Sequence, residues 1–377
     1  MRKAITPMQC LVKRRLSKET LYDLLPAITF RLTGGLSIFY AMIFARFFLS
    51  FIILSLFSFG HKEQKLSAFR ISGFAQGTGY HILYYAPDSL VTRGQTDSIF
   101  ARIDSSLSIY KPYSLISRFN QAQNGIETDR MLRDVVRKSM QVNKITKGAF
   151  DITVQPLVQA WGFSAKRIAA LPDSVEIKSL LNCVGPKHVR LRGNRLIKDK
   201  PCAAIDVNGI AQGYSVDLLA KFLESKGIAN YLVELGGEIR VKGRKYPSGE
   251  MMSVGIESPG DDSDNPLPVV RTIRVGDGAV TTSGNYRKFY QAGLKKISHL
   301  IDPKTGYPIQ NEMISVTVVA REAITADAYD NALMNMGVEE ALKFVKRQKN
   351  VQAYFIYHKT DGSVADTATA GFYKLMR

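Results

Sequence analysis

Residues 203–227, AAIDVNGIAQGYSVDLLAKFLESKG, decide the fold class. They predict a short apolar strand, a glycine-containing turn, and then a helix that ends at Gly227. The following residues 229–243, ANYLVELGGEIRVKG, predict another strand with a double-glycine break. The first amides of a helix point outward without helical partners, so the turn is a candidate phosphate cradle. An ordinary strand-to-helix turn explains the same pattern equally well.

Mixed element types continue on both sides of this segment. Alternation predicts strands at 69–86 and a hairpin at 188–198, and helical spacing of apolar residues predicts amphipathic helices at 96–109 and 129–145. Two more helices are predicted at 324–337 and 340–348, before a closing strand at 351–358. There is no regular strand–helix repeat, which favours an α+β architecture over a doubly wound sheet.

The first 65 residues predict a leader in front of a folded domain at 66–377. Residues 47–60 form a run of 14 residues without charge, which fits a signal-peptide core better than a bilayer span. Our hypothesis is that translation begins at Met42, directly ahead of this run, and that residues 1–41 are absent from the native product. The alternative is an uncleaved membrane anchor, because no clear small-x-small cleavage site follows. Either interpretation places the folded part on the extracytoplasmic (periplasmic) side of a bacterial inner membrane.

Charge and cysteine content narrow the classes of partner. The leader holds ten Lys and Arg against three Asp and Glu, and so carries +7 of the chain's +18. In the folded part the basic residues are scattered singly and no nucleic-acid-binding motif appears, so we expect a solvated basic surface and no nucleic-acid partner. Cys183 and Cys202 are the two cysteines outside the leader. Outside the cytosol they could pair, or they could be buried free thiols, and the sequence leaves both open.

Polar residues gather where two strand-like runs end. AVTTSGNYRKFY at 279–290 carries Thr282, Ser283 and Arg287, and SHLIDPKTGYPI at 298–309 carries His299 and Asp302. Such density beside strand ends is typical of a functional site, although Asp-Pro-Lys-Thr-Gly is by itself an ordinary turn.

The predicted helix ITADAYDNALMNMG at 324–337 carries unexpected oxygen-bearing side chains. Asp327 and Asn331 are four residues apart, so they share one face and can offer a carboxylate and an amide oxygen to one cation. Asp330 is interpreted as pointing elsewhere, in a solvated or structural role. The alternative role for Asp327 is a charge that complements the helix dipole.

Taken together, these motifs resemble the FAD:protein FMN transferase (ApbE) family over about residues 66–377. DVNGIAQGYSVD at 206–217 is similar to the family's D-[LV]-G-G-I-A-K-G-Y-x-x-D, and TADAYDNAL at 325–333 to T-A-D-A-L-A-T-A-L. AVTTSGNYR at 279–287 and HLIDPKTG at 299–306 match as well, and GTGY, SLISRFN and GAFDITVQPL match more weakly. The chain departs from the patterns at Asn331, where Thr is usual, and at Gln212, which replaces a Lys.

The resemblance implies a fold of antiparallel sheets with flanking helices and an FAD cleft between subdomains. It implies a Mg²⁺-dependent enzyme that takes FAD as substrate, attaches FMN to a Thr or Ser hydroxyl of an acceptor protein, and releases AMP. The implied acceptor is a flavoprotein domain of a membrane redox complex. Two alternatives stay open: an FAD pyrophosphatase that yields FMN and AMP, and a non-catalytic periplasmic FAD-binding protein.

The resemblance also assigns roles to individual residues. A metal is expected at Asp327, Asn331 and the backbone of Gly209. His299 is the candidate for helping to deprotonate the incoming hydroxyl, because imidazole titrates near neutral pH, and Asp302 is expected to fix its turn or approach the metal. The residues expected to contact FAD are Thr78, Tyr80, Ser117, Asn120, Asp151, Asn208, Gly209, Glu234, Thr282, Ser283 and Arg287. For Tyr80 a core aromatic is the alternative, and for Asp151 and Glu234 it is surface capping.

Overall fold

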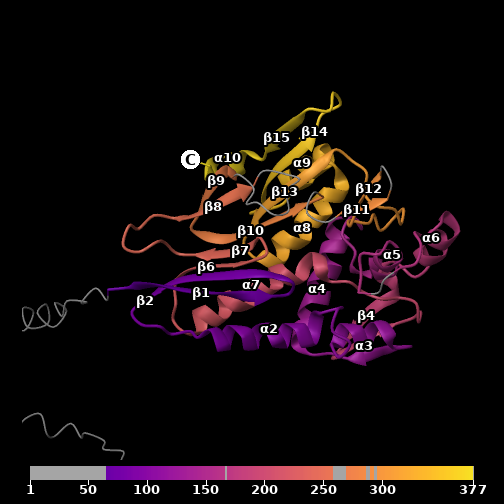
Figure 1. The fold of residues 1–377 in the computed structure, drawn as a ribbon, viewed down its shortest axis with the longest axis horizontal. Helices are drawn as coiled ribbons and strands as arrows, with labels where there is room; N and C mark the ends of the chain where they lie inside the picture. Colours follow the sequence, from indigo (N-terminus) through magenta and orange to yellow (C-terminus); the bar gives the residue numbers. More distant parts are fainter. Residues whose placement is uncertain (1–64, 166–167, 258–268, 286–288, 293–294, 377) are drawn as a thin grey trace, which may run out of the picture. The chain divides into compact units, whose positions relative to one another are not determined.

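The computed structural model describes residues 65–376 except 166–167, 258–268, 286–288 and 293–294, and Figure 1 shows how these elements are arranged. The predicted signal segment or anchor and the start at Met42 lie outside the described residues. Within the described part, no helix combines the length and the apolar character that a membrane crossing requires.

An eight-stranded antiparallel sheet forms the centre of the described domain. Its strand order is β1-β2-β6-β7-β10-β13-β14-β15, so the strands follow one another across the sheet in the order of the sequence, with β1 and β15 at opposite edges. The strands are β1 (Ser67–Ala75), β2 (Thr78–Ala86), β6 (Asn230–Leu235), β7 (Glu238–Lys242), β10 (Asp277–Gly284), β13 (Met313–Ala320), β14 (Gln352–His358) and β15 (Val364–Ala368). The sheet confirms the α+β class, and the predicted strands at 69–86 form the hairpin β1–β2.

Three smaller sheets accompany the central one. They are β3-β5-β4, β8-β9 and β11-β12. Their strands are β3 (Gly125–Glu127), β4 (Val189–Arg192), β5 (Arg195–Lys198), β8 (Met252–Glu257), β9 (Val269–Val275), β11 (Phe289–Ala292) and β12 (Lys295–Ser298). The pair β4–β5 is the hairpin predicted at 188–198.

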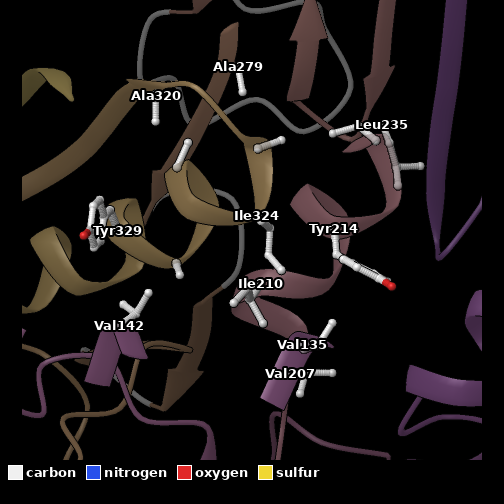
Figure 2. Packing of buried hydrophobic residues seen from close by; sticks show 14 of the residues in the cluster. Val135, Val142, Val207, Ile210, Tyr214, Leu235, Ala279, Ala320, Ile324 and Tyr329 are labelled. Carbon is white, nitrogen blue, oxygen red and sulfur yellow. The ribbon is translucent and has the colours of Figure 1, made fainter. Parts of the chain in front are cut away.

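Both faces of the central sheet are buried. Neighbouring residues of one strand point to opposite faces, so Phe355 packs in the larger core and Ile356 in a second core on the other side. The larger core is filled by α2 (Arg93–Leu107), α4 (Arg130–Ile145), α7 (Asn208–Ser225) and α8 (Ala323–Met336), and Figure 2 shows part of this packing. The hairpin β8–β9 and the helix α10 (Ala370–Leu375) fill the second core. Helices α3 (Leu115–Gln121) and α9 (Val338–Lys346) also contribute buried residues to the larger core.

A separate lobe precedes α7 in the sequence. It contains η2 (Ile152–Val154), α5 (Gln155–Ala160), α6 (Ser174–Leu181) and η3 (Pro186–His188), and it has its own small apolar cluster around Leu157 and Ile177. Ile301 belongs to this cluster, and the indole N–H of Trp161 donates to the Gly306 carbonyl at 2.9 Å. The lobe therefore holds the predicted turn at 299–306.

The two cysteines of the folded part form a disulfide, which decides between the alternatives that the sequence left open. Cys183 and Cys202 are bonded, with Cα atoms 5.6 Å apart. The bridge joins the end of the α6 region to the segment that leads into α7.

The prediction of a short strand at 203–207, at the start of the segment 203–227, is wrong. This segment is not in any strand of the described sheets. Instead, the Asn120 side chain accepts from Ile205 N at 2.8 Å and donates to Ile205 O at 2.9 Å, and Asp206 N donates to the Ile152 carbonyl at 2.7 Å. A side-chain amide takes the place of a neighbouring strand, which the local sequence pattern cannot reveal.

Candidate active site

A cleft of about 430 Å³ lies where the start of α7 and one face of α8 meet the β1–β2 turn, the end of β10 and the lobe. This is within the usual size range of small-molecule sites. The cleft is built from two sides that differ in chemistry: the helices and β10 contribute oxygen-bearing groups, and the lobe contributes apolar groups.

Close contact between α7 and α8 builds the polar side. A Cβ added at Gly213 would lie 2.4 Å from the Ala323 carbonyl oxygen, so only glycine lets the helices approach this closely. One turn earlier, a Cβ on Gly209 would lie 3.2 Å from the Asn331 side chain. The Gly213 amide donates to Asp327 Oδ2 at 2.8 Å, which places the carboxylate against α7.

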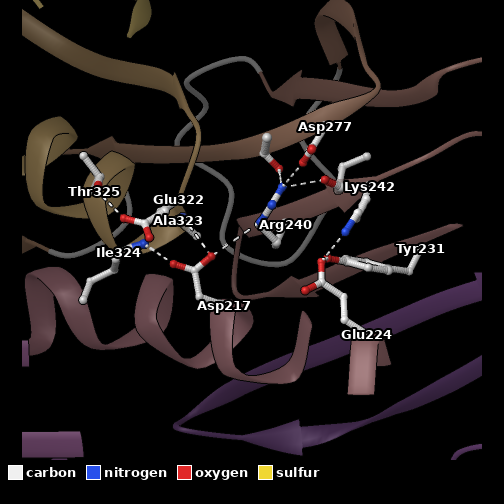
Figure 3. Close-up of polar contacts among 12 residues, drawn as sticks. Asp217, Glu224, Tyr231, Arg240, Lys242, Asp277, Glu322, Ala323, Ile324 and Thr325 are labelled. Atoms are coloured by element: carbon white, nitrogen blue, oxygen red, sulfur yellow. Dashed lines mark hydrogen bonds and ion pairs between the residues drawn. The ribbon is translucent and has the colours of Figure 1, made fainter. Parts of the chain in front are cut away.

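Asp217, one turn beyond Gly213, fixes the start of α8. Its carboxylate accepts from Ala323 N at 3.1 Å and from Ile324 N at 2.9 Å. These are two of the amides that a helix N-terminus leaves without helical partners. Figure 3 shows Arg240 beside the same carboxylate, at 3.7 Å from Asp217 Oδ1. Positions 209, 213 and 217 of α7 thus set the place of α8 in the cleft.

Four oxygens surround the amide nitrogen of Asn331. Asn331 Nδ2 lies 3.0 Å from the Asp327 carbonyl oxygen and 3.0 Å from Asp330 Oδ1, and 3.4 Å from both Asp327 Oδ1 and the Gly209 carbonyl oxygen. An amide NH₂ has only two hydrogens to donate, so it cannot satisfy four acceptors. Oxygens that converge in this way are suited to a cation.

The chemistry of this donor set fits a hard divalent cation. Carboxylate, amide and backbone carbonyl oxygens are the ligands that such ions prefer, and rotating the Asn331 amide by half a turn would add its own oxygen. In the described residues, no three His, Cys, Asp or Glu side chains are grouped so that they alone could hold a metal. Backbone and amide oxygens would therefore have to complete the coordination.

The carboxylates of α8 are electrostatically strained without a counter-charge. Burial raises the pKa of Asp327 to about 7, and the negative charge of Asp217 adds to this, against the opposing effect of the Gly213 amide. Burial and the charge of Asp327 also raise the pKa of Asp330 well above its ordinary value. A cation between these groups would relieve both effects.

The described lining of the cleft contains no Lys or Arg side chain. Its carboxylates are Asp151, Asp206, Glu238, Asp327 and Asp330. Gln212 lines the cleft at the position where the pattern quoted above has Lys. Among the described residues, phosphates in this cleft would meet carboxylates and no Lys or Arg, so a cation beside these carboxylates would favour phosphate binding.

The lobe side of the cleft is apolar. Phe150, Val154, Val158, Phe163 and Ile301 line it. His299 also lines the cleft, with its ring edge-on to Phe163 at a centroid distance of 6.3 Å. This side suits a flat aromatic ring, and the polar side suits phosphate with a cation.

Comparison with known proteins agrees with this chemistry. The model of the ApbE family matches residues 76–355. A FAD:protein FMN transferase of Vibrio cholerae is 35% identical over 317 residues, which are 82% of this chain and 93% of that protein. One from Escherichia coli K12 is 35% identical over 265 residues, 68% of this chain and 74% of that protein. The chain belongs to the ApbE family.

Solved structures of ApbE proteins share the fold. The flavin transferase ApbE from Vibrio cholerae matches with a TM-score of 0.73 and 34% identity, over 82% of this chain and all of the other. The apo form of the flavinyl transferase ApbE from Pseudomonas stutzeri matches with a TM-score of 0.73 and 30% identity, over 82% and 97%. The expected ApbE architecture is confirmed.

The structure brings most of the predicted ApbE site residues into the cleft. Those that line it are Thr78, Asp151, Asn208, Gly209, Thr282, Ser283, His299, Asp327 and Asn331. Arg287 lies outside the described residues. The carboxylate of Asp151 also caps η2, with Oδ1 at 2.8 Å from Thr153 N, so the capping alternative holds alongside its place in the lining.

Tyr80 is not part of the cleft. Its side chain is fully buried in the larger core against Phe100, at 4.9 Å between ring centroids, and its hydroxyl donates to Asp97 Oδ1 at 2.7 Å. The expected contact with FAD is therefore wrong, and the alternative of a core aromatic is correct. Ile82 and Tyr84 share this face of β2, as the period of a strand requires.

Four more predicted residues do not line the cleft. Asn120 clamps Ile205, as described above, and Ser117 is buried in α3, where its amide donates to the capping Ser114 hydroxyl at 3.1 Å. Glu234 Oε1 accepts from Gly237 N at 2.9 Å in the β6–β7 turn. Asp302 accepts from Lys304 N and the Thr305 hydroxyl, both at 3.0 Å, so it fixes its turn, which is one of the two roles expected for it.

Groups of the chain itself already bind three of the amides at the start of α7, where the phosphate cradle was predicted. Asn208 N donates to Asp206 Oδ1 at 2.8 Å, and the amides of Ile210 and Ala211 both donate to the Val207 carbonyl, at 3.0 and 2.9 Å. A carboxylate of the chain itself thus occupies the place where an anion would bind.

Sequence reasoning missed three carboxylates of the cleft: Asp206, Glu238 and Asp330. Asp330 is only 1% exposed and lines the cleft, so its interpretation as a residue that points elsewhere on the helix is wrong. The signal was present, because residues three apart on a helix share a face as residues four apart do. Glu238 and Asp206 needed the tertiary structure, which brings the β6–β7 turn to the start of α7.

Proposed function

We propose that this chain transfers FMN from FAD to a Thr or Ser hydroxyl of an acceptor protein and releases AMP, with Mg²⁺ as the required cation. Two relatives cited above carry the name of this reaction, and the cleft offers the two environments that a flavin dinucleotide needs. The observation that carries the proposal is the group of oxygens around Asn331, in a cleft whose described lining has no Lys or Arg side chain.

In this proposal, Asp327, Asn331 and the Gly209 carbonyl hold the cation. A bound Mg²⁺ would neutralise the diphosphate and the charge that develops on it during transfer. Asp217 and Gly213 do not contact the cation. They are positioning residues, because they set the position of α8 and of the Asp327 carboxylate. The apolar lobe side, with Phe163, receives an aromatic ring and keeps water from it.

The reaction exchanges one P–O bond for another. The oxygen of the acceptor hydroxyl attacks the phosphorus of the FMN half, the bond from this phosphorus to the bridging oxygen breaks, and that oxygen leaves with AMP. The hydroxyl proton must be removed during the attack, and His299 is its acceptor here because it is the imidazole in the cleft lining. Exclusion of water decides between transfer to the acceptor and hydrolysis of FAD.

The test is incubation of the chain with FAD, Mg²⁺ and a candidate acceptor domain. We expect fluorescent flavin that stays on the acceptor through denaturing electrophoresis, together with AMP release. Asp327→Ala or a chelator should abolish both, whereas Asp88→Ala, which removes an exposed carboxylate outside the cleft, should change neither. AMP release without labelled acceptor would indicate a pyrophosphatase, and flavin binding without AMP release would indicate a carrier.

We further propose that the folded part works on the extracytoplasmic side of the inner membrane and modifies a flavoprotein domain of a membrane redox complex there. The Cys183–Cys202 disulfide supports this location, because such bonds persist mainly outside the cytosol. Protease treatment of spheroplasts tests it: the domain should be digested while a cytosolic marker stays intact. Protection of the domain under these conditions would contradict the location.

A further inference from the structure

Asp330 is a buried carboxylate of the cleft. The roles proposed above for its neighbours Asp327 and Asn331 do not explain why a carboxylate is present at this position. It lies on α8 between Asp327 and Asn331 in sequence, lines the cleft and is 1% exposed. Its Oδ1 is 3.0 Å from Asn331 Nδ2. Its Oδ2 makes no hydrogen bond of good geometry among the described residues, and neither does the Thr281 hydroxyl, although this hydroxyl is near enough to lower the pKa of Asp330 against the larger effect of burial.

A buried carboxylate oxygen without a partner is costly for a fold. Leaving such an acceptor unsatisfied destabilises the folded state, and a second carboxylate nearby adds repulsion. Asp327 is three residues away on the same helix face, so the two carboxylates face the same part of the cleft. A positive ligand between them would remove both penalties.

The distances place Asp330 within the same group of oxygens as Asp327. Asn331 Nδ2 is in contact with oxygens of Asp327, Asp330 and Gly209 at 3.0 to 3.4 Å. No Lys or Arg of the described cleft lining supplies the missing positive charge.

We propose that Asp330 is a ligand of the cation site in this chain, so that the site carries two carboxylates and takes up a divalent cation before FAD arrives. The proposal rests on the cation site of the proposed function and deepens it. A site with one carboxylate relies on the diphosphate to complete the charge, whereas a second carboxylate raises the affinity for the free ion, because affinity in oxygen-ligand sites follows the number of charged ligands.

The test is titration of the metal-free, full-length chain with Mn²⁺ in the absence of FAD, with free Mn²⁺ followed by electron paramagnetic resonance. We expect the wild type to bind Mn²⁺ and Asp330→Ala to bind it about 10- to 100-fold more weakly. Asp330→Asn, which keeps a neutral oxygen, should be intermediate. Asp88→Ala is the matched control at an exposed carboxylate, and it should leave binding unchanged.

A second readout separates a ligand from a structural residue. Asp330→Ala removes a buried unpartnered oxygen, and the family pattern quoted above has Ala at this position, so the variant should fold. Its metal-free Tm should equal or exceed that of the wild type, and the rise in Tm on adding Mn²⁺ should shrink. A lower metal-free Tm with unchanged Mn²⁺ affinity would show a structural role and overturn the proposal.

Two further outcomes would also overturn it. One is Mn²⁺ binding by Asp330→Ala as tight as that of the wild type, and the other is a wild type that binds no Mn²⁺ without FAD. FMN transfer by the wild type is measured in a separate assay. If transfer is observed while the Mn²⁺ titrations fail, the role of Asp330 falls and the proposed function stands.

Discussion

Asp327 combines two demands at the scale of a single residue. Its Oδ2 holds α7 through the Gly213 amide, and its Oδ1 faces the cleft beside Asn331 and Asp330. Because it is 3% exposed, its charge is poorly solvated in the protein alone. Binding of a proton or, in the proposed function, of a cation would relieve this unfavourable burial of charge.

This predicts a pH dependence of stability. Burial raises the pKa of Asp327 from 3.8 to about 7. An acid whose pKa is raised by folding stabilises the fold fully below its unfolded pKa and loses this contribution as pH rises through the folded value. The Tm of the metal-free protein should therefore fall as the pH rises from about 4 to about 7. Asp327→Asn keeps an oxygen for the Gly213 amide and should weaken this fall, whereas parallel curves for both proteins would contradict the argument.

Bound Mg²⁺ should raise the Tm, and it should do so most at the pH values where the metal-free protein is least stable. Cation and proton compete for the carboxylate, so the rise in Tm caused by Mg²⁺ should be larger above pH 7 than below it. Differential scanning fluorimetry at several pH values measures this directly. An Mg²⁺ effect that is constant with pH, or equal in Asp327→Asn, would count against Asp327 as a ligand.

How well the sequence predicts a residue's role depends on whether its partners are local. Asp327 and Asn331 are neighbours on one helix, so helical spacing alone placed them together. Asn120 binds Ile205, which is 85 residues away, and no local pattern signals such a contact. For Tyr80 the strand period did carry the answer, since Ile82 and Tyr84 share its buried face.

At the scale of elements, the site depends on how closely α7 and α8 cross. Gly209, Gly213 and Asp217 recur every four residues along α7 and face α8. The sequence predicted both helices from periodicity, and it predicted one strand with a double-glycine break where the structure has the paired strands β6 and β7. It did not predict the crossing of the helices, because contact between them depends on which faces meet, and it wrongly predicted a strand at 203–207.

Gly213→Ala tests this crossing. The added Cβ would lie 2.4 Å from the Ala323 carbonyl oxygen and 2.7 Å from Asp327 Cβ, so the helices must move apart. We expect a loss of about 1–3 kcal/mol in the free energy of unfolding, and weaker metal binding. Gly94→Ala in α2 is the control, because nothing lies within 4 Å of its added Cβ.

The control variant Gly94→Ala should not lose stability. Alanine favours the helix over glycine, so Gly94→Ala should leave stability unchanged or raise it by up to roughly 1 kcal/mol. Urea denaturation of the three proteins gives the comparison. Equal stability of Gly213→Ala and the wild type would show that the helices do not need a glycine where they cross.

At the scale of the whole molecule, the cleft lies between the sheet with its helices and the separate lobe. The Cys183–Cys202 disulfide joins the α6 region of the lobe to the segment that enters α7, with 19 residues of separation. The sequence could state only that these cysteines were able to pair, because the distance between them is a property of the tertiary fold.

Removal of the disulfide should destabilise the domain. For a loop of this length, the double variant Cys183→Ser/Cys202→Ser should lose about 3 kcal/mol in the free energy of unfolding. Replacing both cysteines avoids a free thiol that could form other bonds. The parallel measurement compares the free energy of unfolding of the wild-type protein with and without reductant. Equal stabilities in both comparisons would contradict a stabilising role of the disulfide.

The central claim is that a divalent cation held by α7 and α8 compensates the diphosphate of FAD in this cleft. Anomalous diffraction from crystals grown with Mn²⁺ and FAD tests it most directly. We predict a manganese peak beside Asp327, Asn331 and the Gly209 carbonyl, next to the diphosphate, with an aromatic ring of the dinucleotide against Phe163. Manganese bound elsewhere, or FAD bound outside the cleft, would contradict the claim.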